Sequence, residues 1–148
     1  MLNLAASTSA NVSVVTSASG TVEVACSYVD FASGTVTPGA AANLSISTNT
    51  TTQIVAGATS TTRNVKTLSI RNDHASVTNA IEVTMTDGSV PVTLWKGTLL
   101  PGESVVYLDG VGWTQLTAGG IPYVSGTTGQ VDVQTFTGNG TWTKPTAF

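Results

Sequence analysis

Apolar and polar residues alternate along much of this chain, and turn-forming residues divide it into short stretches. Between Val65 and Leu116, for example, Leu68 and Ile70 are apolar and the residue between them is a serine. A period of two places like side chains on one face of a strand, which is typical of antiparallel sheets with one face on a core and one in water. The pattern therefore predicts strands at residues 65–72, 79–86, 92–95, 104–108 and 111–113, with turns at Asp87-Gly88, Pro101-Gly102 and Asp109-Gly110.

Apolar residues of equal parity mark the core face that we expect on these strands. Pro91 has no backbone N–H to give to a ladder, so the strand after it is expected to begin there or to lie at a sheet edge. The expected core groups are Leu68 with Ile70, Ile81 with Val83 and Met85, Val92 with Leu94, and Val105 with Tyr107.

The same alternation predicts two strands nearer the N-terminus, at residues 11–16 and 21–30. Only four residues separate them, so we expect a hairpin, preceded by a loosely held arm at residues 1–10. A two-stranded ribbon is marginal in water, so its apolar side chains need a surface on the main domain, on a neighbouring subunit or on another protein. The residues expected to dock there are Val22, Val24, Tyr28 and Phe31.

Turn-forming residues between Phe31 and Gly39 predict a connector and a domain boundary. The chain is thereby divided into a docking hairpin or arm at residues 1–36, a β-sandwich at 37–118 and a Gly/Thr-rich connector at 119–148. The predicted fold is all-β. It consists of the N-terminal β-hairpin segment, an antiparallel, jelly-roll-like β-sandwich, and a short C-terminal strand segment around residues 130–137 that leads to a distal region.

Composition limits the partners of such a domain. Charged residues make up 9% of the chain and the net charge is −3. Nucleic-acid binding needs Lys and Arg clustered on one face, whereas Arg63, Lys66 and Arg71 fit a solvated strand face, so no nucleic acid is expected. No apolar run reaches membrane-spanning length, and residues 1–7 lack the basic region and long apolar core of a signal peptide. A polar but nearly uncharged surface suits a subunit of an assembly.

The residue types that carry enzyme chemistry are few and scattered. His74 is the only histidine and is expected to cap a turn, and the lone Cys26 is expected to be a small buried hydrophobe. Metal sites need several such ligands together. A Ser-His-Asp arrangement built by the fold stays open, but no serine occupies a Gly-x-Ser-x-Gly elbow. The sequence therefore predicts no catalytic, metal-binding or cofactor-binding residue, no cofactor and no enzymatic activity.

Aromatic residues leave one alternative to core packing. Tyr107 has the parity of the core face, whereas Trp113 follows a turn and Trp142 lies in the Gly/Thr-rich segment. Exposed rings of this kind stack on sugars or form subunit contacts. Trp113 and Trp142 are therefore the candidate exposed aromatic contacts.

Two groups of residues resemble a known family. The segment Arg63-Asn-Val-Lys-Thr-Leu-Ser-Ile-Arg-Asn72, followed by His74-Ala-Ser76, Thr86-Asp-Gly88, Leu99-Leu-Pro-Gly-Glu-Ser104 and Tyr107-Leu-Asp-Gly-Val-Gly-Trp113, is similar to a β-domain in virion proteins of tailed bacteriophages. The segment Gln134-Thr-Phe-Thr-Gly-Asn-Gly-Thr-Trp-Thr-Lys-Pro145 resembles the entry to the glycine-rich distal domains of phage fibres. Together the resemblance covers about residues 20–145.

This resemblance implies a virion structural protein, made in the host bacterial cytoplasm and located in the virion. It would be a head-fibre, tail-fibre or other appendage subunit attached through its N-terminal segment, and residues 119–148 would begin the distal fibre segment. The family implies a homo-oligomer, with a trimer favoured, and contacts with capsid, portal or neck, or tail proteins. Any contact with a host-surface glycan would belong to the glycine-rich region expected after Pro145. The alternatives are a capsid decoration or collar protein and a carbohydrate-binding or adhesin module.

Overall fold

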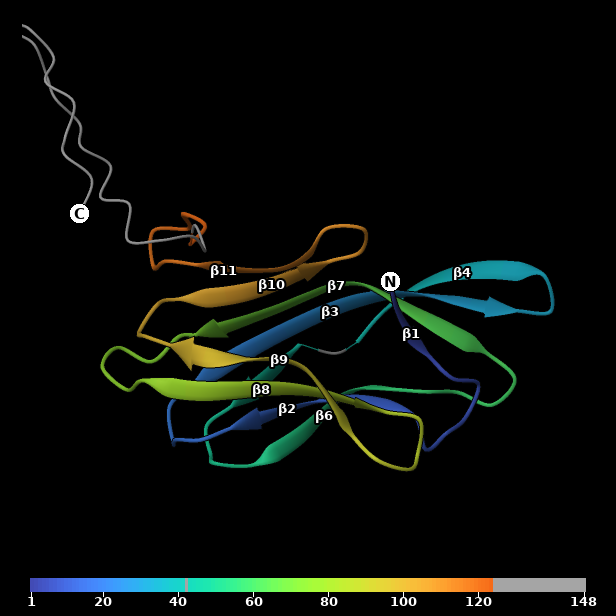
Figure 1. The fold of residues 1–148 in the computed structure, drawn as a ribbon, viewed down its shortest axis with the longest axis horizontal. Helices are drawn as coiled ribbons and strands as arrows, with labels where there is room; N and C mark the ends of the chain where they lie inside the picture. The colour runs from blue at the N-terminus through green and yellow to red at the C-terminus, as the bar shows by residue number, and fades with distance from the viewer. Residues whose placement is uncertain (42, 124–148) are drawn as a thin grey trace, which may run out of the picture.

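The fold was analysed in a computed structural model that describes residues 1–41 and 43–123 (Figure 1). Eleven strands and no helix occur in these residues, so none of them forms a helix that could cross a membrane. In chain order the strands are β1 (Leu2–Leu4), β2 (Asn11–Thr16), β3 (Val22–Ala32), β4 (Thr35–Ala40), β5 (Leu44–Ile46), β6 (Thr51–Ala56), β7 (Thr62–Asn72), β8 (Asn79–Thr86), β9 (Val92–Leu99), β10 (Ser104–Leu108) and β11 (Gly112–Leu116).

The strands form two sheets, in which every pairing is antiparallel. The seven-stranded sheet has the order β11-β10-β7-β3-β4, with β1 paired to β7 and β5 paired to β3. The four-stranded sheet has the order β6-β2-β8-β9. The predicted all-β, antiparallel β-sandwich is confirmed.

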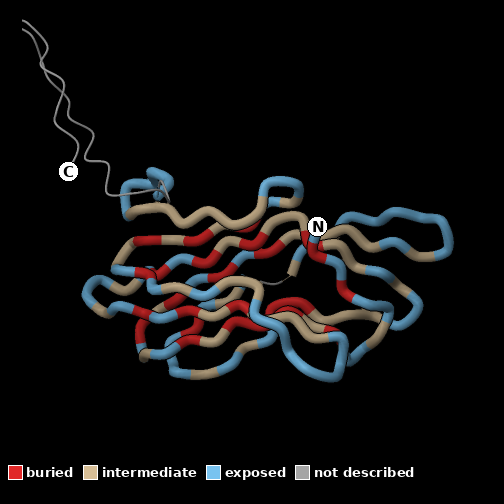
Figure 2. Tube along the Cα trace, viewed as in Figure 1, coloured by how far each residue is buried: buried red, intermediate tan, exposed pale blue. Residues whose placement is uncertain are grey.

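The core lies between the two sheets, and the buried residues lie along strands of both sheets (Figure 2). Leu68 and Ile70 of the larger sheet are 0% exposed, and so is Val83 of the smaller one. The alternation therefore predicted the core correctly here. Burying a side chain of this size contributes about 1.5–3 kcal/mol, so the sandwich is held together mainly by this layer.

The predicted hairpin between residues 11–16 and 21–30 is wrong, because β2 and β3 belong to different sheets. Both strands have an apolar face, and each face is buried by the opposite sheet rather than by the neighbouring strand. The link between them crosses the sandwich and is held by Asn79. The side-chain oxygen of Asn79 accepts hydrogen bonds from the backbone N–H of Ser17 (3.2 Å) and Ala18 (3.0 Å).

The expectation of a loosely held N-terminal arm is also wrong. Residues 2–4 form β1, which pairs with the first half of β7. Leu2 and Leu4 are 6% and 1% exposed and belong to the core. Small and polar residues surround these two leucines in the sequence. Two apolar residues in such surroundings were too few to predict a buried strand.

β-Bulges change which parity faces the core. In β7, Lys66 is the extra residue, so Val65 and Leu68 both point inward although one is odd and the other even. In β9, the extra residue is Leu94, and Trp95 takes the inward position opposite Val83. Val92 is 58% exposed, so its placement in the core was wrong. The expectation that follows from Pro91 is confirmed, because β9 begins at the next residue and is an edge strand.

The predicted boundary between residues 36 and 37 falls inside β4, and the predicted connector is a strand. β3 pairs with β7 along nearly its whole length, so residues 1–36 share one core with the strands that follow. The predicted strand at residues 130–137 lies outside the described residues.

Candidate assembly surface

The strands β3 and β4 form a hairpin that extends beyond the body of the sandwich (Figure 1). Its turn is Ser33-Gly34, with φ angles of 50° and 82°. Positive φ at both central residues defines the turn that best matches the twist of two paired strands. We call this end of the molecule the hairpin end.

The inner side of the hairpin is fixed by Arg63 of β7. Its Nε and Nη2 donate to the two carboxylate oxygens of Asp30, each at 2.7 Å, and its Nη1 donates to the carbonyl oxygen of Ala56 at 2.6 Å. The guanidinium carbon also lies 3.9 Å from the centre of the Tyr28 ring. The hydrogen bonds from Arg63 hold the pKa of Asp30 below its usual value. These contacts make the base of the hairpin rigid.

A glycine completes this base. Gly39 lies opposite Tyr28 in the β3–β4 ladder, and the Tyr28 ring lies over it. A Cβ atom at position 39 would lie 2.5 Å from Cε2 of the ring, which is closer than such atoms approach. The close stacking of ring on backbone therefore requires glycine here.

The outer side of the hairpin is apolar and open to water. Phe31 and Val36 are directly opposite each other and are 53% and 62% exposed. Val29 and Pro38 form the next pair on the same face and are half-buried and exposed, respectively. We call these four residues the hairpin patch. Exposed apolar patches on soluble domains commonly mark binding surfaces.

The edge of the hairpin has little protection against pairing. β4 carries no charged residue and is hydrogen-bonded on one side only, to β3. Natural edge strands are commonly blunted by charged side chains or by proline, and here only Pro38 has that effect. Both the face and the edge of the hairpin are thus suited to contact with another chain.

The four residues expected to dock divide into two groups. Val22 and Val24 are 0% and 2% exposed, so of the three surfaces expected to cover them it is the core of the same chain that does so, and they do not dock to another chain. Tyr28 packs against the core and under Arg63, whereas Phe31 is exposed in the hairpin patch. Val36 was missed. The alternation of Thr35-Val-Thr after Ser33-Gly34 was the signal for it.

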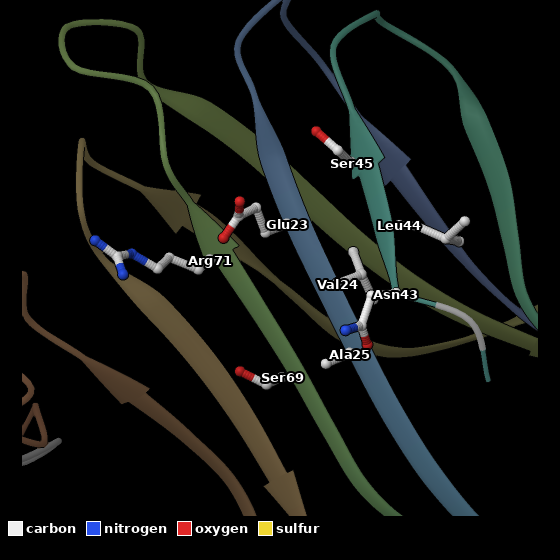
Figure 3. A pocket seen from close by; sticks show the side chains of 8 residues that line it. All are labelled: Glu23, Val24, Ala25, Asn43, Leu44, Ser45, Ser69 and Arg71. Carbon is white, nitrogen blue, oxygen red and sulfur yellow. The ribbon is translucent and has the colours of Figure 1, made fainter. Parts of the chain in front are cut away.

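An open polar groove lies on the outer face of the seven-stranded sheet (Figure 3). Glu23 of β3 and Arg71 of β7 are opposite each other in the ladder, and Asn43 and Ser45 lie along the β5 side. Its volume is about 350 Å³. Arg71 is paired with Asp73 at 3.3 Å, and the groove is not enclosed, so it offers no water-excluding site for chemistry.

The aromatic residues close one edge of the sandwich. The rings of Trp95 and Trp113 stack across the two sheets with centroids 6.2 Å apart, and Tyr107 packs against Trp113 at 5.2 Å. Tyr107 is 5% exposed, which confirms its core position, and Trp113 is half-buried against the core. Trp113 is thus a packing residue rather than a free platform. Trp142 lies outside the described residues.

The two remaining candidates for chemistry, His74 and Cys26, have structural roles. His74 Nδ1 accepts hydrogen bonds from the backbone N–H of Ser76 (3.1 Å) and Val77 (2.9 Å), which confirms the turn-capping interpretation. Cys26 is 5% exposed, as expected of a buried hydrophobe, and burial raises the pKa of its thiol to about 11. Among residues 1–41 and 43–123, no three His, Cys, Asp or Glu side chains are placed to hold a metal ion.

The chain leaves the sandwich at the end opposite the hairpin (Figure 1). There the backbone folds back on β11, with the N–H of Tyr123 donating to the carbonyl of Gln115 at 2.8 Å. The Tyr123 hydroxyl also donates to Glu103, whose side chain is 4% exposed in the β9–β10 turn. We call this point, where Tyr123 is anchored, the exit. It was not predicted from the sequence, because the contact joins residues twenty positions apart through a turn.

Comparisons with known proteins add no relative. No protein-family model, curated protein or solved structure matches this chain.

Proposed function

We propose that this protein is a bacteriophage virion structural protein, a fibre or appendage subunit of the head or tail that is attached to the particle at its hairpin end. It assembles as a homo-oligomer, with a trimer favoured, and acts by attachment rather than by catalysis. The sequence resemblance to tailed-phage virion proteins supplies the biological setting. The physical support comes from the surfaces of the sandwich.

The observation that carries this proposal is the difference between the two ends of the domain. The hairpin, with its apolar face and open edge, lies at one end, and Tyr123 lies at the other end. A spacer in an appendage needs this arrangement, because one end must dock and the opposite end must pass the chain outward. Strand addition at open edges and apolar burial supply affinity without any reactive group.

The rigidity of the sandwich supports the same role. Its two sheets share one continuous core, and buried polar side chains fix the connecting loops. For example, Asn72 is 0% exposed and donates to the carbonyl oxygens of Val77 (2.8 Å) and Leu99 (2.9 Å), which ties two loops together at the exit end. A rigid domain of this kind keeps the parts of an appendage on its two sides at a fixed distance and orientation.

Labelling of intact particles tests the proposal. Antibodies raised against residues 1–123 are applied to purified particles and viewed by electron microscopy, with particles from a phage that lacks the gene as the control. We expect label at defined appendages of the particle. Label at the collar or over the whole capsid would select the collar or decoration alternatives. Protein found only free in the lysate would contradict the proposal.

A further inference from the structure

A second exposed apolar surface surrounds the exit. Leu100, in the β9–β10 turn, is 50% exposed, and Ile121 and Tyr123 are 67% and 48% exposed. We call Leu100, Ile121 and Tyr123 the exit patch. The exit lies at the end of the sandwich opposite the hairpin (Figure 1), so contact of the hairpin patch with the particle leaves the exit patch uncovered.

Hydrogen bonds to one carboxylate join the parts of the chain that carry the exit patch. Glu103 is 4% exposed, and its side chain accepts hydrogen bonds from the backbone N–H of Leu100 at 2.9 Å and from the hydroxyl of Tyr123. Gln115 of β11 donates to the same carboxylate at 3.4 Å. The β9–β10 turn, the end of β11 and Tyr123 therefore meet at one point and belong to one surface.

The backbone ties Ile121 into the same surface. Its N–H donates to the Thr117 hydroxyl oxygen at 3.2 Å, and its carbonyl oxygen accepts from the backbone N–H of Thr117 at 2.9 Å. The next residue, Pro122, forms an antiparallel bridge with Leu116 at the end of β11. Ile121 thus lies on a closed loop that is fixed at both ends, and its exposure is a property of the fold.

The segments that form the exit patch contain one charged residue, and that residue is buried. Residues 97–104 and 112–123 include no charged side chain except Glu103. The β7–β10 ladder brings Arg71 next to the start of β10, and Arg71 is paired with Asp73 at 3.3 Å. A surface that meets its own symmetry-related copies brings equal charges together, and like charges facing each other are costly. The exit patch carries no such cost.

We propose that the exit patches of neighbouring copies of this chain pack against one another around the symmetry axis of the homo-oligomer. This inference rests on the proposed function and names the surface that its copies share. Copies that attach to the particle by the same end are parallel in a closed ring, so their exit ends lie at one level along the axis. Residues 124–148 of each copy follow Tyr123, so the starting points of these segments are then gathered at the axis.

Crosslinking of cysteine variants of the full chain tests this contact directly. Ile121→Cys, treated with a short bis-maleimide, is expected to give covalent dimers on a denaturing gel, because equivalent residues face each other near the axis. Cys26 is 5% exposed and stays unreacted in the folded protein. Val90→Cys is the matched control. Val90 is 76% exposed and precedes β9, whereas the exit turn follows β9, so this variant is expected to stay uncrosslinked.

An aspartate at the same two positions gives an independent measurement. In Ile121→Asp a carboxylate would be buried between copies, so the dissociation constant of the homo-oligomer, measured by analytical ultracentrifugation, is expected to rise by at least about tenfold. Val90→Asp is expected to leave that constant unchanged. Both positions are exposed, so both variants are expected to fold, which circular dichroism checks.

Four results would overturn the inference. They are an unchanged protein that stays monomeric, an Ile121→Cys variant that gives no dimer, equal crosslinking of Val90→Cys, and an oligomer that Ile121→Asp does not weaken. Failure of the proposed function looks different. An oligomer that labels phage particles but behaves alike in the exit and control variants removes this contact and leaves the virion role. A chain that crosslinks at Ile121→Cys but is absent from particles does the opposite.

Discussion

Arg63 binds both carboxylate oxygens of Asp30 at 2.7 Å and joins the projecting hairpin to the body of the sandwich. The two residues face each other across β3 and β7, and their side chains are 14% and 24% exposed. A bidentate pair of this geometry fixes orientation as well as distance. The hairpin patch is therefore held ready for a partner, which lowers the entropy that docking would otherwise cost.

Asp30→Asn is expected to loosen the hairpin. The amide cannot replace both charged hydrogen bonds, and the free energy of unfolding should fall by about 1 kcal/mol, since water partly screens this pair. Urea unfolding measures the loss, and hydrogen exchange should show it concentrated in β4. Glu82→Gln, which breaks the exposed pair with Lys96 at 3.1 Å, is the control and should leave stability unchanged. Equal losses in the two variants would contradict the special role of Asp30.

The contribution of Asp30 should depend on pH in a defined direction. Arg63 lowers the pKa of Asp30 in the folded protein relative to the unfolded chain. The stabilisation is then fully present above the ordinary carboxyl pKa of about 3.9, and it is lost as the pH falls through the lower folded value. The difference in unfolding free energy between the unchanged protein and Asp30→Asn should be constant from neutral pH down to mildly acidic pH and shrink below that. A difference that grew as the pH fell would contradict a lowered pKa of Asp30 in the folded protein.

Leu4→Ala should destabilise the whole domain, although Leu4 lies in a segment of small residues at the N-terminus. Leu4 is 1% exposed, and truncation of a buried leucine costs about 2–5 kcal/mol. Leu100→Ala is the matched control, because Leu100 is 50% exposed and its truncation should cost less than about 0.5 kcal/mol. Thermal or urea unfolding compares them. If both variants unfolded like the unchanged protein, β1 would not be part of the core.

Cys26 should be unreactive until the protein unfolds. Burial raises the pKa of its thiol to about 11, so almost no thiolate is present at mildly alkaline pH. A thiol reagent added at that pH should react slowly with the folded protein and at once in concentrated urea. Rapid, stoichiometric reaction of the folded chain would mean that the strand carrying Cys26 opens readily.

The period-two alternation was sufficient to predict the class of fold, because one face of each strand is covered by a sheet and the other is wet. Leu68, Ile70, Val83 and Val105 were placed in the core on this basis and are buried. What alternation cannot encode is the partner of a strand. The apolar face of β2 could be buried by β3 beside it or by the opposite sheet, and the sequence pattern is the same in both cases.

Bulges set a second limit. One extra residue reverses the parity of a strand, and nothing in the residues around Lys66 or Leu94 distinguishes a bulged position from a regular one. The candidate surface was only partly predictable for a related reason. Phe31 was recognised as apolar and in need of cover, but the Asp30–Arg63 pair joins residues that are 33 positions apart.

The orientation of the sandwich on the intact particle is the most direct test of this account. Electron cryomicroscopy of particles that carry the protein would resolve the two sheets and the projecting hairpin. We predict that the hairpin ends of neighbouring copies lie together against the particle and that the exit at Tyr123 points away from it. Density with the exit against the particle and the hairpin free in solvent would contradict the account.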